Sequence, residues 1–564
     1  MRKISFLLVA LLLMGMQVIQ AQRVITGKVT SAEDGSGIPG VQIVVKGTLH
    51  GTTTDIDGKY RLTCPDKADM LIYTFVGMKT QEVKIGAKNI IDVIMASDVT
   101  NIEGVVVTAM GIKKEKKALG YAVQDVGGKE LTRGANPNLA TAIQGKVSGV
   151  EIRQSSGMPG ASSQILIRGA RSFDGNNAPL YVIDGMPISS NSDYNVSNGG
   201  VVGTDYSGRS IDIDPNDIES INVLKGQAAA ALYGMRASNG VIIITTKSGK
   251  NVGKGSPIQV SFSTNYSFDN ISRLPKKQTK YAQGINGVYK HTNSSSWGCE
   301  IDSLPWDPGY GYQSAYPGGQ PGQYWNRQKG QWVTPGVYDN LDDFFKTGFT
   351  NNNSVNLSQA GNYGNYSIGF GNTRQEGIIP STNMKRYNAK AAANFDINEK
   401  WKTGFSANYS ETKINKVPSG NSSILFTVYG SPSSYDLAGT PFNEFGFPYK
   451  QISYRTGAVG DNPYWVTKNN SFLEATKRFF GNTYLDYTPN DWMNVRYQLG
   501  VDQYTTDMEE IYELGSAQTG GSTNNGTYPS TLSPGGGQIT NKGVISSDIN
   551  SLLNITNKKE ITPD

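Results

Sequence analysis

The sequence predicts a mainly β protein made of an N-terminal β-sandwich, a mixed α+β domain and the first strands of a transmembrane antiparallel β-barrel. The 564 residues include 66 glycines and 30 tyrosines but only two cysteines. Short apolar runs separated by Gly and Asp-Gly turns fill the first hundred residues. From Ile258 onward, longer segments alternate apolar and polar side chains. Such alternation is typical of strands whose two faces meet different surroundings.

The N-terminus has the pattern of an export signal. Arg2 and Lys3 precede an apolar run from Ile4 to about Met16, and the small residue Ala21 follows. This predicts a secretory signal peptide over residues 1–21, cleaved after Ala21. A membrane anchor is the alternative, but the run is shorter than the roughly 20 residues that a spanning helix needs.

Composition excludes several functional classes. Without the two cations of the signal peptide the formal net charge falls from +5 to +3, which is too small for a nucleic-acid-binding protein of this length. Cys64 and Cys299 fall in segments that read as separate domains, so they predict no disulfide framework, and their role stays open. Because His50 and His291 are the only histidines, we expect no metal site, no cofactor and no catalytic residues.

Residues 22–97 alternate in short runs such as RVITGKVT and GVQIVVKGT, with a turn about every ten residues. This predicts a small β-sandwich. Two motif-like segments within it are expected to be turns. GSGIPG at 35–40 has the glycine spacing of a dinucleotide loop, but a strand-like segment follows it where a helix is required. DIDG at 55–58 lacks the remaining acidic residues of a calcium loop.

A candidate partner-binding strand lies in the linker 98–117. The apolar residues 105–109 are followed by the charged run 113–117. An extended segment with a free edge can pair with a strand of another protein. The alternative is that 105–109 form the last strand of the sandwich, followed by a linker. The residues alone do not decide between the two.

Residues 118–250 mix short helices with strands. Asn136 and Pro137 predict the N-cap and the first residue of one helix, and Asp214 and Pro215 do the same for another. The strand-like segments ILIRG, PLYVIDG and VIIITT are interleaved with these helices. The pattern predicts a compact α+β domain.

The alanine-rich segment GQAAAALYG at 226–234 fits either phosphate binding or close packing. A phosphate loop would be followed by a helix that carries Lys-Ser or Lys-Thr, whereas here Lys225 precedes the helix. The small side chains therefore predict close packing, as a domain that fills the lumen of a wide barrel requires. The glycines predict turns with positive φ.

Residues 256–564 carry the pattern of outer-membrane strands. PIQVSFSTNYSF, RYNAKAAANF and WKTGFSANYSET alternate in polarity. Turns of three or four residues join strands on one side, and the long stretches 271–350 and 413–473 join them on the other. This asymmetry predicts short periplasmic turns and long extracellular loops. A soluble sandwich would alternate too, but it does not explain the asymmetry. We expect about seven strands after residue 256.

Several of these segments resemble known families. Residues 23–97, through PGVQIVVKGT, GTTTDIDGKY and TFVGM, resemble the carboxypeptidase-regulatory-like domain, which implies a transthyretin-like sandwich without catalysis. GVVVTAMGIKKEKKALGYAVQ, LIRGARSF, NNAPLYVIDGMPI and LKGQAAAALYGMRASNGVIIITTKSGK resemble SusC/RagA-type TonB-dependent outer-membrane receptors of the Bacteroidota. The resemblance implies this order of domains: signal peptide 1–21, sandwich 22–97, TonB box and linker 98–117, plug 118–250, and partial barrel 256–564.

The resemblance also implies a transport receptor and no enzyme. Such a receptor imports a nutrient, an oligosaccharide or a peptide, with a SusD-type surface lipoprotein as its lid. TonB, supplied with energy by ExbB and ExbD, pairs with the box and pulls the plug aside. The sandwich and the box then lie in the periplasm, and the barrel lies in outer-membrane lipid. The alternatives are a signalling receptor for a sigma/anti-sigma pair, and an adhesin or hydrolase. Residues 23–97 show neither the helix of the signalling domain nor a zinc-ligand pattern.

Matching by position gives the candidate site residues. The TonB box comprises Glu103, Gly104, Val105, Val106, Val107, Thr108 and Ala109. The plug signature comprises Arg168, Gly169, Arg171, Ser172, Phe173, Tyr181, Asp184, Gly185, Pro187, Lys225, Gly226, Tyr233, Gly234, Arg236, Ala237, Asn239 and Gly240.

Two further expectations concern the substrate and the length. The long loops are rich in Trp, Tyr, Asn, Gln and Asp, and because aromatic faces stack on sugar rings we expect an oligosaccharide. Interfacial and loop packing of these aromatics is the alternative. Family members close a barrel of about 22 strands, so we expect this chain to be the N-terminal part of a longer receptor or a truncated product. Alone, it should not form a heat-modifiable barrel.

Overall fold

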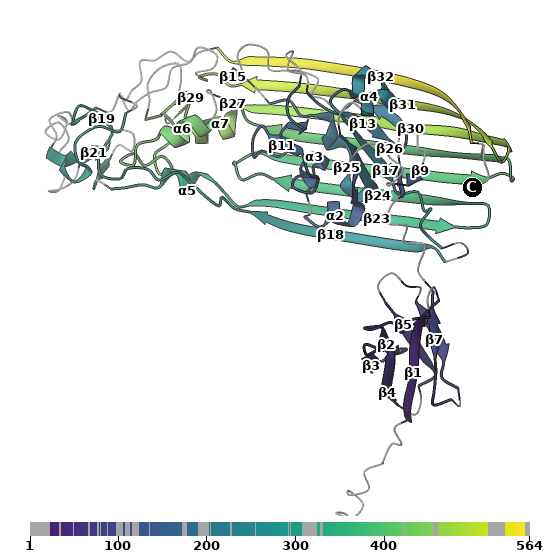
Figure 1. Ribbon diagram of the computed structural model, residues 1–564. Coiled ribbons are helices and arrows are strands. Elements are labelled where there is room, and N and C mark those ends of the chain that lie inside the picture. Colours follow the sequence, from purple (N-terminus) through teal and green to yellow (C-terminus); the bar gives the residue numbers. More distant parts are fainter. Residues whose placement is uncertain are drawn as a thin grey trace, which may run out of the picture. The chain divides into compact units, whose positions relative to one another are not determined.

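The computed structural model describes residues 23–558, with gaps of which the longest are 97–104, 108–112, 116–122, 172–176, 190–201, 307–323, 327–330, 455–460 and 517–535 (Figure 1). The expected signal peptide 1–21 lies outside the described residues. The chain forms two compact units, Met1–Val105 and Val106–Asp564. Among the described residues, no helix is both long and apolar enough to cross a membrane.

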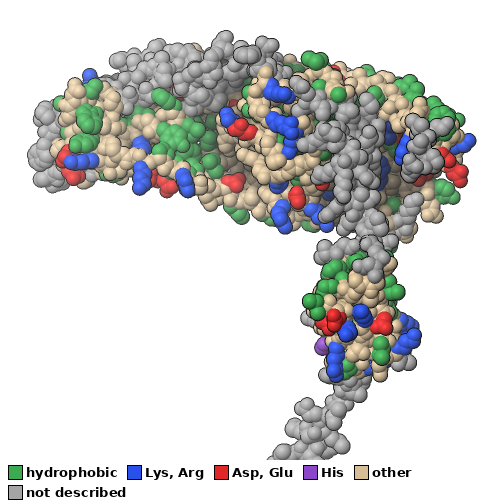
Figure 2. Space-filling model, viewed as in Figure 1, with side chains coloured by type: hydrophobic (Ala, Val, Ile, Leu, Met, Phe, Trp, Pro, Cys, Tyr) green, Lys and Arg blue, Asp and Glu red, His purple; other side chains and the backbone are tan. Residues whose placement is uncertain are grey.

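The first unit is a β-sandwich, as predicted. One sheet has the order β4-β1-β7 and the other β3-β2-β5-β6. The strands are β1 (Arg23–Ser31), β2 (Gln42–Val45), β3 (Gly51–Thr53), β4 (Lys59–Cys64), β5 (Met70–Thr74), β6 (Gln81–Lys84) and β7 (Val93–Met95). Alternate residues point into one core that includes Ile25, Ile43 and Leu71. Charges of both signs are interspersed on the visible face of this domain (Figure 2).

Both motif-like segments of the sandwich are turns. In DIDG, Asp55 Oδ1 accepts hydrogen bonds from the backbone N–H groups of Asp57 at 3.0 Å and Lys59 at 2.8 Å. In GSGIPG, Gly35 and Gly40 have φ of 69° and 77°. Among the described residues, no group of three or more His, Cys, Asp or Glu side chains is arranged to hold a metal ion. Cys64 is buried and Cys299 is half-buried, and both are free thiols.

The second unit contains the plug. Its central sheet has the order β10-β16-β17-β13-β14, in which β13 and β17 run parallel and the other pairs antiparallel. A separate hairpin pairs β11 with β12. The plug elements are β10 (Val123–Gly127), α2 (Gly128–Thr132), α3 (Leu139–Ala142), β11 (Val150–Gln154), β12 (Ser163–Ile167), β13 (Leu180–Ile183), β14 (Met186–Ile188), β15 (Val202–Gly203), η3 (Arg209–Asp212), η4 (Pro215–Asp217), β16 (Ile218–Leu224), α4 (Ala228–Tyr233), η5 (Met235–Ala237) and β17 (Val241–Thr246).

One of the two predicted helix caps is correct. Asp214 caps the short 3₁₀ helix η4, with Pro215 as its first residue and the Asp214 side chain accepting from the backbone N–H of Asn216. For α3 the prediction was wrong by two residues, because Asn138 is the cap and accepts from the N–H of Ala140. Asn136 instead accepts from the N–H of Asn138 at 3.2 Å, which explains why it resembled a cap.

The large sheet of the second unit, here called the wall, is antiparallel and has the order β18-β23-β24-β25-β26-β30-β31-β32. These eight strands are one more than the expected count of about seven. Their bounds are β18 (Gln259–Asp269), β23 (Gly348–Ala360), β24 (Gly364–Glu376), β25 (Asn383–Asp396), β26 (Trp401–Lys416), β30 (Ser471–Asn490), β31 (Met493–Tyr512) and β32 (Gln538–Asn557).

The long connections lie together at one end of the wall (Figure 1). Their short elements are β19 (Gly284–Ile285), β20 (Val288–Tyr289), η6 (Ile301–Trp306), β21 (Tyr324–Asn326), β22 (Gln331–Val333), α5 (Asn340–Phe344), β27 (Ser419–Gly420), α6 (Ile424–Gly430), β28 (Asn443–Glu444), β29 (Phe447–Gln451) and α7 (Pro463–Asn469). Among the described residues, the opposite end carries the tight turns after β23, β25 and β30 and the segment that leads from β17 into β18. The predicted asymmetry of the connections is therefore present.

The two faces of the wall differ in chemistry. On the face turned away from the plug, here called the outward face, large apolar side chains such as Phe405, Phe479 and Leu485 are 41–45% exposed. On the inner face, alternate residues of the same strands are buried polar groups such as Ser406 and Arg478. Apolar-out and polar-in alternation is the pattern of an outer-membrane barrel wall.

Candidate functional site

The signature turn of the plug contacts the wall directly. Asp184 and Gly185 form the two-residue turn between β13 and β14, with φ of 48° and 90°. Positive φ at both positions is typical of the tight turns that Asp-Gly favours. The Asp184 carboxylate accepts from Ser406 Oγ of β26 at 2.9 Å and from Thr246 of β17, and its backbone carbonyl accepts from Gln498 Nε2 of β31 at 2.9 Å.

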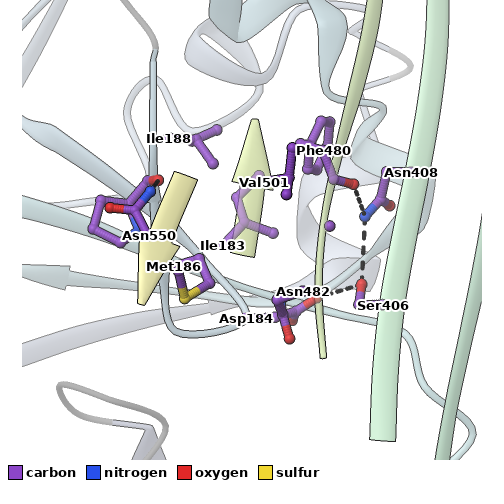
Figure 3. A pocket seen from close by; sticks show the side chains of 12 residues that line it. Ile183, Asp184, Met186, Ile188, Ser406, Asn408, Phe480, Asn482, Val501 and Asn550 are labelled. Carbon is purple, nitrogen blue, oxygen red and sulfur yellow. Dashed lines mark hydrogen bonds between the residues drawn. The ribbon is translucent and has the colours of Figure 1, made fainter. Parts of the chain in front are cut away.

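This turn leaves almost no free space against the wall. Figure 3 shows Ile183, Met186 and Ile188 of the plug facing Asn408, Phe480 and Val501 of the wall. The cavity between them measures only about 10 Å³, which is room for about one water molecule. A Cβ atom on Gly185 would lie 3.2 Å from Gln498 Oε1. The plug signature therefore serves, at this turn, to fit the plug closely to the wall.

A buried cluster of charges joins the plug to the wall a few residues away. Arg209 of η3 reaches across to Glu474 of β30, with Nη2 2.6 Å from Oε1. Lys416 of β26 lies 3.6 Å from the other oxygen of Glu474. All three side chains are at most 1% exposed. Their charges lie in a low-dielectric environment, where an unpaired charge would be costly.

Arg478 of β30 is the second centre of the cluster. Its Nε and Nη2 donate to the two carboxylate oxygens of Asp502 at 2.9 and 2.8 Å, a bidentate pair within the wall. Its Nη1 and Nη2 also donate to the backbone carbonyls of Arg209 at 3.0 Å and Ser189 at 2.6 Å, both in the plug. One guanidinium group thus holds two plug segments.

The third centre is Arg386 of β25. Its Nη1 donates to the carbonyls of Pro137 at 2.8 Å and Ile211 at 2.7 Å, and its Nη2 lies 3.4 Å from Asp214. The cluster as a whole balances four cations against four carboxylates: Arg209, Arg386, Lys416 and Arg478 against Asp212, Asp214, Glu474 and Asp502.

Asp217 lies beside this cluster at the end of η4. Its carboxylate accepts from Asn388 Nδ2 at 2.8 Å, and its backbone carbonyl accepts from Lys390 at 3.1 Å. Burial, and then the neighbouring Asp214 carboxylate, raise the pKa of Asp217 to about 6, although Lys390 opposes the shift. Asp217 is therefore expected to titrate in the mildly acidic range.

The remaining described signature residues shape the plug itself. Tyr181 is buried in its core, and the carbonyl of Pro187 accepts from Asn550 Nδ2 of β32 in the wall at 3.5 Å. Lys225 donates to Gln124 Oε1 and Ser148 Oγ, both at 3.0 Å. The contacts of Tyr181 and Lys225 lie within the plug.

The other signature positions lie in two segments of the plug, 168–171 and 233–240. Arg168 and Gly169 have φ of 59° and 85°, and Arg171 donates to the carbonyl of Ser238 at 3.3 Å. Gly234 and Gly240 have positive φ, as predicted for the glycines around the alanine-rich segment. Tyr233 is half-buried, Ala237 is fully buried, Arg236 is exposed and Asn239 donates to the carbonyl of Ala178 at 3.5 Å.

The prediction of close packing along the alanine helix α4 was wrong at one position. Ala231 is exposed and Ala230 is half-buried. The residues of this segment that do pack tightly come after the helix: a Cβ on Gly240 would lie 2.8 Å from Ile167 Cδ1. Close approach of backbone is thus required at Gly240, and the side chains of Ala228 and Ala229 lie outside the described residues. The predicted site residues Ser172, Phe173 and Gly226 lie outside the described residues.

The TonB-box prediction falls partly on described residues. Val105, Val106 and Val107 form the strand β8, which pairs with β9 (Lys113–Glu115) and belongs to neither sandwich sheet. The first three residues of the charged run 113–117 form the partner strand of β8. Glu103, Gly104, Thr108 and Ala109 lie outside the described residues.

Several aromatic side chains in the long connections are buried by packing. Trp465 is completely buried and donates its indole N–H to the carbonyl of Pro448 at 2.7 Å. Tyr435 and Tyr454 are buried, with ring centroids 5.7 Å apart. Trp297 remains 63% exposed, beside Tyr281 at a centroid distance of 5.5 Å. The Trp297–Tyr281 pair presents an aromatic surface of the kind that stacks on a sugar.

Sequence reasoning did not identify the buried charges of the plug–wall cluster. Their signal was present, because charged residues occupy inward positions in strands that otherwise alternate apolar and polar. The partners of these charges lie more than 200 residues away in the chain for pairs such as Arg209 and Glu474. No local pattern gives that pairing.

The fold and this interface define a receptor of the plugged-barrel class. Residues 115–241 match the family model of the TonB-dependent Receptor Plug Domain, and residues 25–107 match that of the CarboxypepD_reg-like domain. The chain is 30% identical to the TonB-dependent receptor SusC of Bacteroides thetaiotaomicron, over 86% of this chain and 45% of that protein. It is 28% identical to TonB-dependent receptor P26 of Formosa agariphila, over 85% and 42%.

A solved structure, that of the RagAB peptide importer in its "open-open" state, has the same fold. The TM-score is 0.57 at 20% identity, covering 81% of this chain and 47% of that one. The chain belongs to the SusC/RagA family of TonB-dependent receptors. It spans less than half the length of the curated relatives it matches.

Proposed function

We propose that the receptor to which this chain belongs imports a nutrient across the outer membrane, with energy from TonB, and that it is not an enzyme. The proposal rests on one observation: a buried, charge-balanced cluster holds the plug against the polar face of the antiparallel wall. The relatives are TonB-dependent receptors, which fits this role. The proposal places the wall in outer-membrane lipid, and the sandwich and β8 in the periplasm.

The chemistry of the plug–wall interface suits a plug that is held but can be displaced. The charged and hydrogen-bonding groups of the cluster pair with one another while the plug is seated. When the plug moves, water can replace each of these contacts, because hydrogen bonds to water nearly compensate for lost intramolecular ones. Apolar surface of the same area would have no such compensation. A polar interface therefore keeps the plug in place without making its displacement prohibitively costly.

The strand β8 supports the proposed coupling to TonB. Its one partner among the described residues is β9, so the other edge of β8 can accept a strand. Backbone pairing to a free edge gives affinity with little demand on side chains. We propose that TonB pairs there and that force on this segment is passed to the plug, whose first strand, β10, follows at Val123.

For the substrate we propose an oligosaccharide that enters beneath a SusD-type lipoprotein. The exposed Trp297–Tyr281 pair in the long loops supports this choice, since aromatic faces stack on sugar rings. A peptide is the second candidate, because RagAB, which shares the fold, is a peptide importer.

The test uses the complete receptor in its host. Val106→Pro removes one backbone N–H from the candidate TonB strand and should abolish uptake while substrate binding at the surface persists. Val106→Thr is the matched control, because it keeps the N–H and a β-branched side chain, and it should transport normally. Normal uptake by the proline variant would overturn the assignment of the box.

A further inference from the structure

A groove on the outward face of the wall has no part in the proposed import path, although Glu474 of the plug–wall cluster is among the residues that line it. Its volume is about 780 Å³, and it crosses strands β25, β26, β30, β31 and β32. It lies within a few residues of the strand ends that carry the long loops. Ala475 and Gly543 form its floor, because side chains this small leave a depression between taller neighbours.

Opposite charges occupy the two sides of the groove. Lys385 and Lys413 are directly opposite each other on β25 and β26. Lys413 is opposite Ala475, and Ala475 is opposite Asp507 on β31. Adjacent strands are about 4.8 Å apart, so the backbones of Lys413 and Asp507 are separated by about 10 Å. Glu509 lies two residues further along the same edge of the groove.

The folded chain does not explain these charges. Lys385 also lies opposite Arg374 of β24, so three cations stand side by side on neighbouring strands. Directly opposed like charges destabilise a sheet. Arg374 and Lys413 are each relieved by an ion pair, with Glu376 at 2.8 Å and Glu411 at 3.0 Å. In the part of the chain that the structure describes, Lys385, Asp507 and Glu509 have no ion-pair partner.

The groove also lies where apolar surface gives way to charge. Leu473, which lines it, is 41% exposed. Towards the end with the tight turns, the outward side chains become large and apolar, with Tyr409, Phe479 and Ile549 exposed by 43%, 45% and 72%. A ligand that combines charge with long apolar chains matches this transition.

We propose that the groove binds the headgroup of a membrane lipid that carries phosphoethanolamine, in the leaflet next to the long loops. The phosphate oxygens accept from the ammonium groups of Lys385 and Lys413. The ligand's ammonium donates to the carboxylates of Asp507 and Glu509, and its acyl chains lie on the apolar surface below. The inference rests on the proposed membrane location of the wall.

The test measures lipid retention by the complete receptor, purified in detergent, using native mass spectrometry. Phosphatidylethanolamine is compared with phosphatidylglycerol, which lacks the amine, and with diacylglycerol, which lacks the phosphate. Retention should fall in that order. Lys385→Gln with Lys413→Gln should weaken phosphatidylethanolamine binding about 25-fold, about fivefold for each lysine. Asp507→Asn should weaken phosphatidylethanolamine binding and leave phosphatidylglycerol unchanged.

Lys477→Gln is the matched control, because Lys477 is exposed on the same face but does not line the groove. It should retain lipid as the unmodified chain does. Equal retention of diacylglycerol and phosphatidylethanolamine, or an equal loss in the control, would overturn the headgroup site. If free O-phosphoethanolamine at the same concentration competed fully with the lipid, the groove would be a site for a soluble ligand and not for a lipid.

This measurement needs neither substrate nor TonB. A receptor that retains the lipid but fails to import would contradict the import proposal alone. One that imports but shows no preference among the three lipids would contradict the headgroup site alone.

Discussion

Replacing Arg478 by Met should loosen the plug selectively. The Arg478 side chain is fully buried and makes four hydrogen bonds, two to Asp502 in the wall and two to backbone carbonyls of the plug. The substitution leaves the Asp502 carboxylate, 2% exposed, with the Ser189 N–H at 2.9 Å as its remaining hydrogen bond. Breaking a buried pair from one side costs about 3–5 kcal/mol.

The assay is hydrogen exchange of the plug amides, followed by mass spectrometry on the receptor in detergent. A loss of about 3–5 kcal/mol corresponds to exchange roughly 150-fold to several thousandfold faster for peptides that contain Ser189 and Arg209. The sandwich should be unaffected. The double substitution Arg478→Met with Asp502→Leu should recover most of the protection, because removing both charges of a buried pair is often close to neutral.

Lys477→Met is the matched control, since Lys477 is the neighbour of Arg478 in sequence but points to the outward face, and surface substitutions usually cost less than about 0.5 kcal/mol. Exchange in Arg478→Met within threefold of the unmodified receptor would show that the cluster does not hold the plug. If the double variant lost as much exchange protection, in free energy, as the two single variants added together, Arg478 and Asp502 would not act as a pair.

The remaining predictions concern the signature turn, Asp217 and the sandwich. Gly185→Ala should destabilise the plug by about 1–2 kcal/mol, because φ is 90° there; Gly157→Ala, with open space around it, is the control, and equal plug exchange in the two variants would contradict the argument. Asp217 has a pKa raised to about 6 by burial first and by Asp214 second, so the folded state holds this proton more tightly than the unfolded state, where the pKa is about 4. Stability should therefore fall by about 3 kcal/mol as the pH rises from about 4 to 6, and urea titrations of Asp217→Asn should lack this decrease; identical pH profiles would exclude the effect. Residues 23–96 alone should unfold cooperatively in urea, and Ile43→Ala, which empties a fully buried site, should lower the free energy of unfolding by about 2–5 kcal/mol, whereas a fragment without a cooperative transition would show that the sandwich depends on the rest of the chain.

Local patterns in the sequence were enough to predict the kinds of secondary-structure element that the chain forms. The alternation of apolar and polar residues identified the wall strands, because strand side chains point to opposite faces with a period of two. The Asp214 cap of η4 was recognisable because an N-cap depends on a few neighbouring residues. The segment PLYVIDG was read as a strand throughout, whereas its last two residues, Asp184 and Gly185, form a turn. The cap of α3 was misplaced because Asn136 and Asn138 both carry a side chain able to cap.

The tertiary structure alone decided which residues meet. Inward charges in the wall strands indicate a polar lumen, but they do not say that Glu474 pairs with Arg209 or that Arg478 reaches the carbonyl of Ser189. Those contacts depend on where the plug sits along the wall, and many small packing and hydrogen-bonding terms set that position together. The same holds for the loops, in which Trp465 is buried and Trp297 is exposed although both are tryptophans in aromatic-rich segments. The sequence specifies periodicity and turns through neighbouring residues, whereas contacts between segments hundreds of residues apart exist only once the chain has folded.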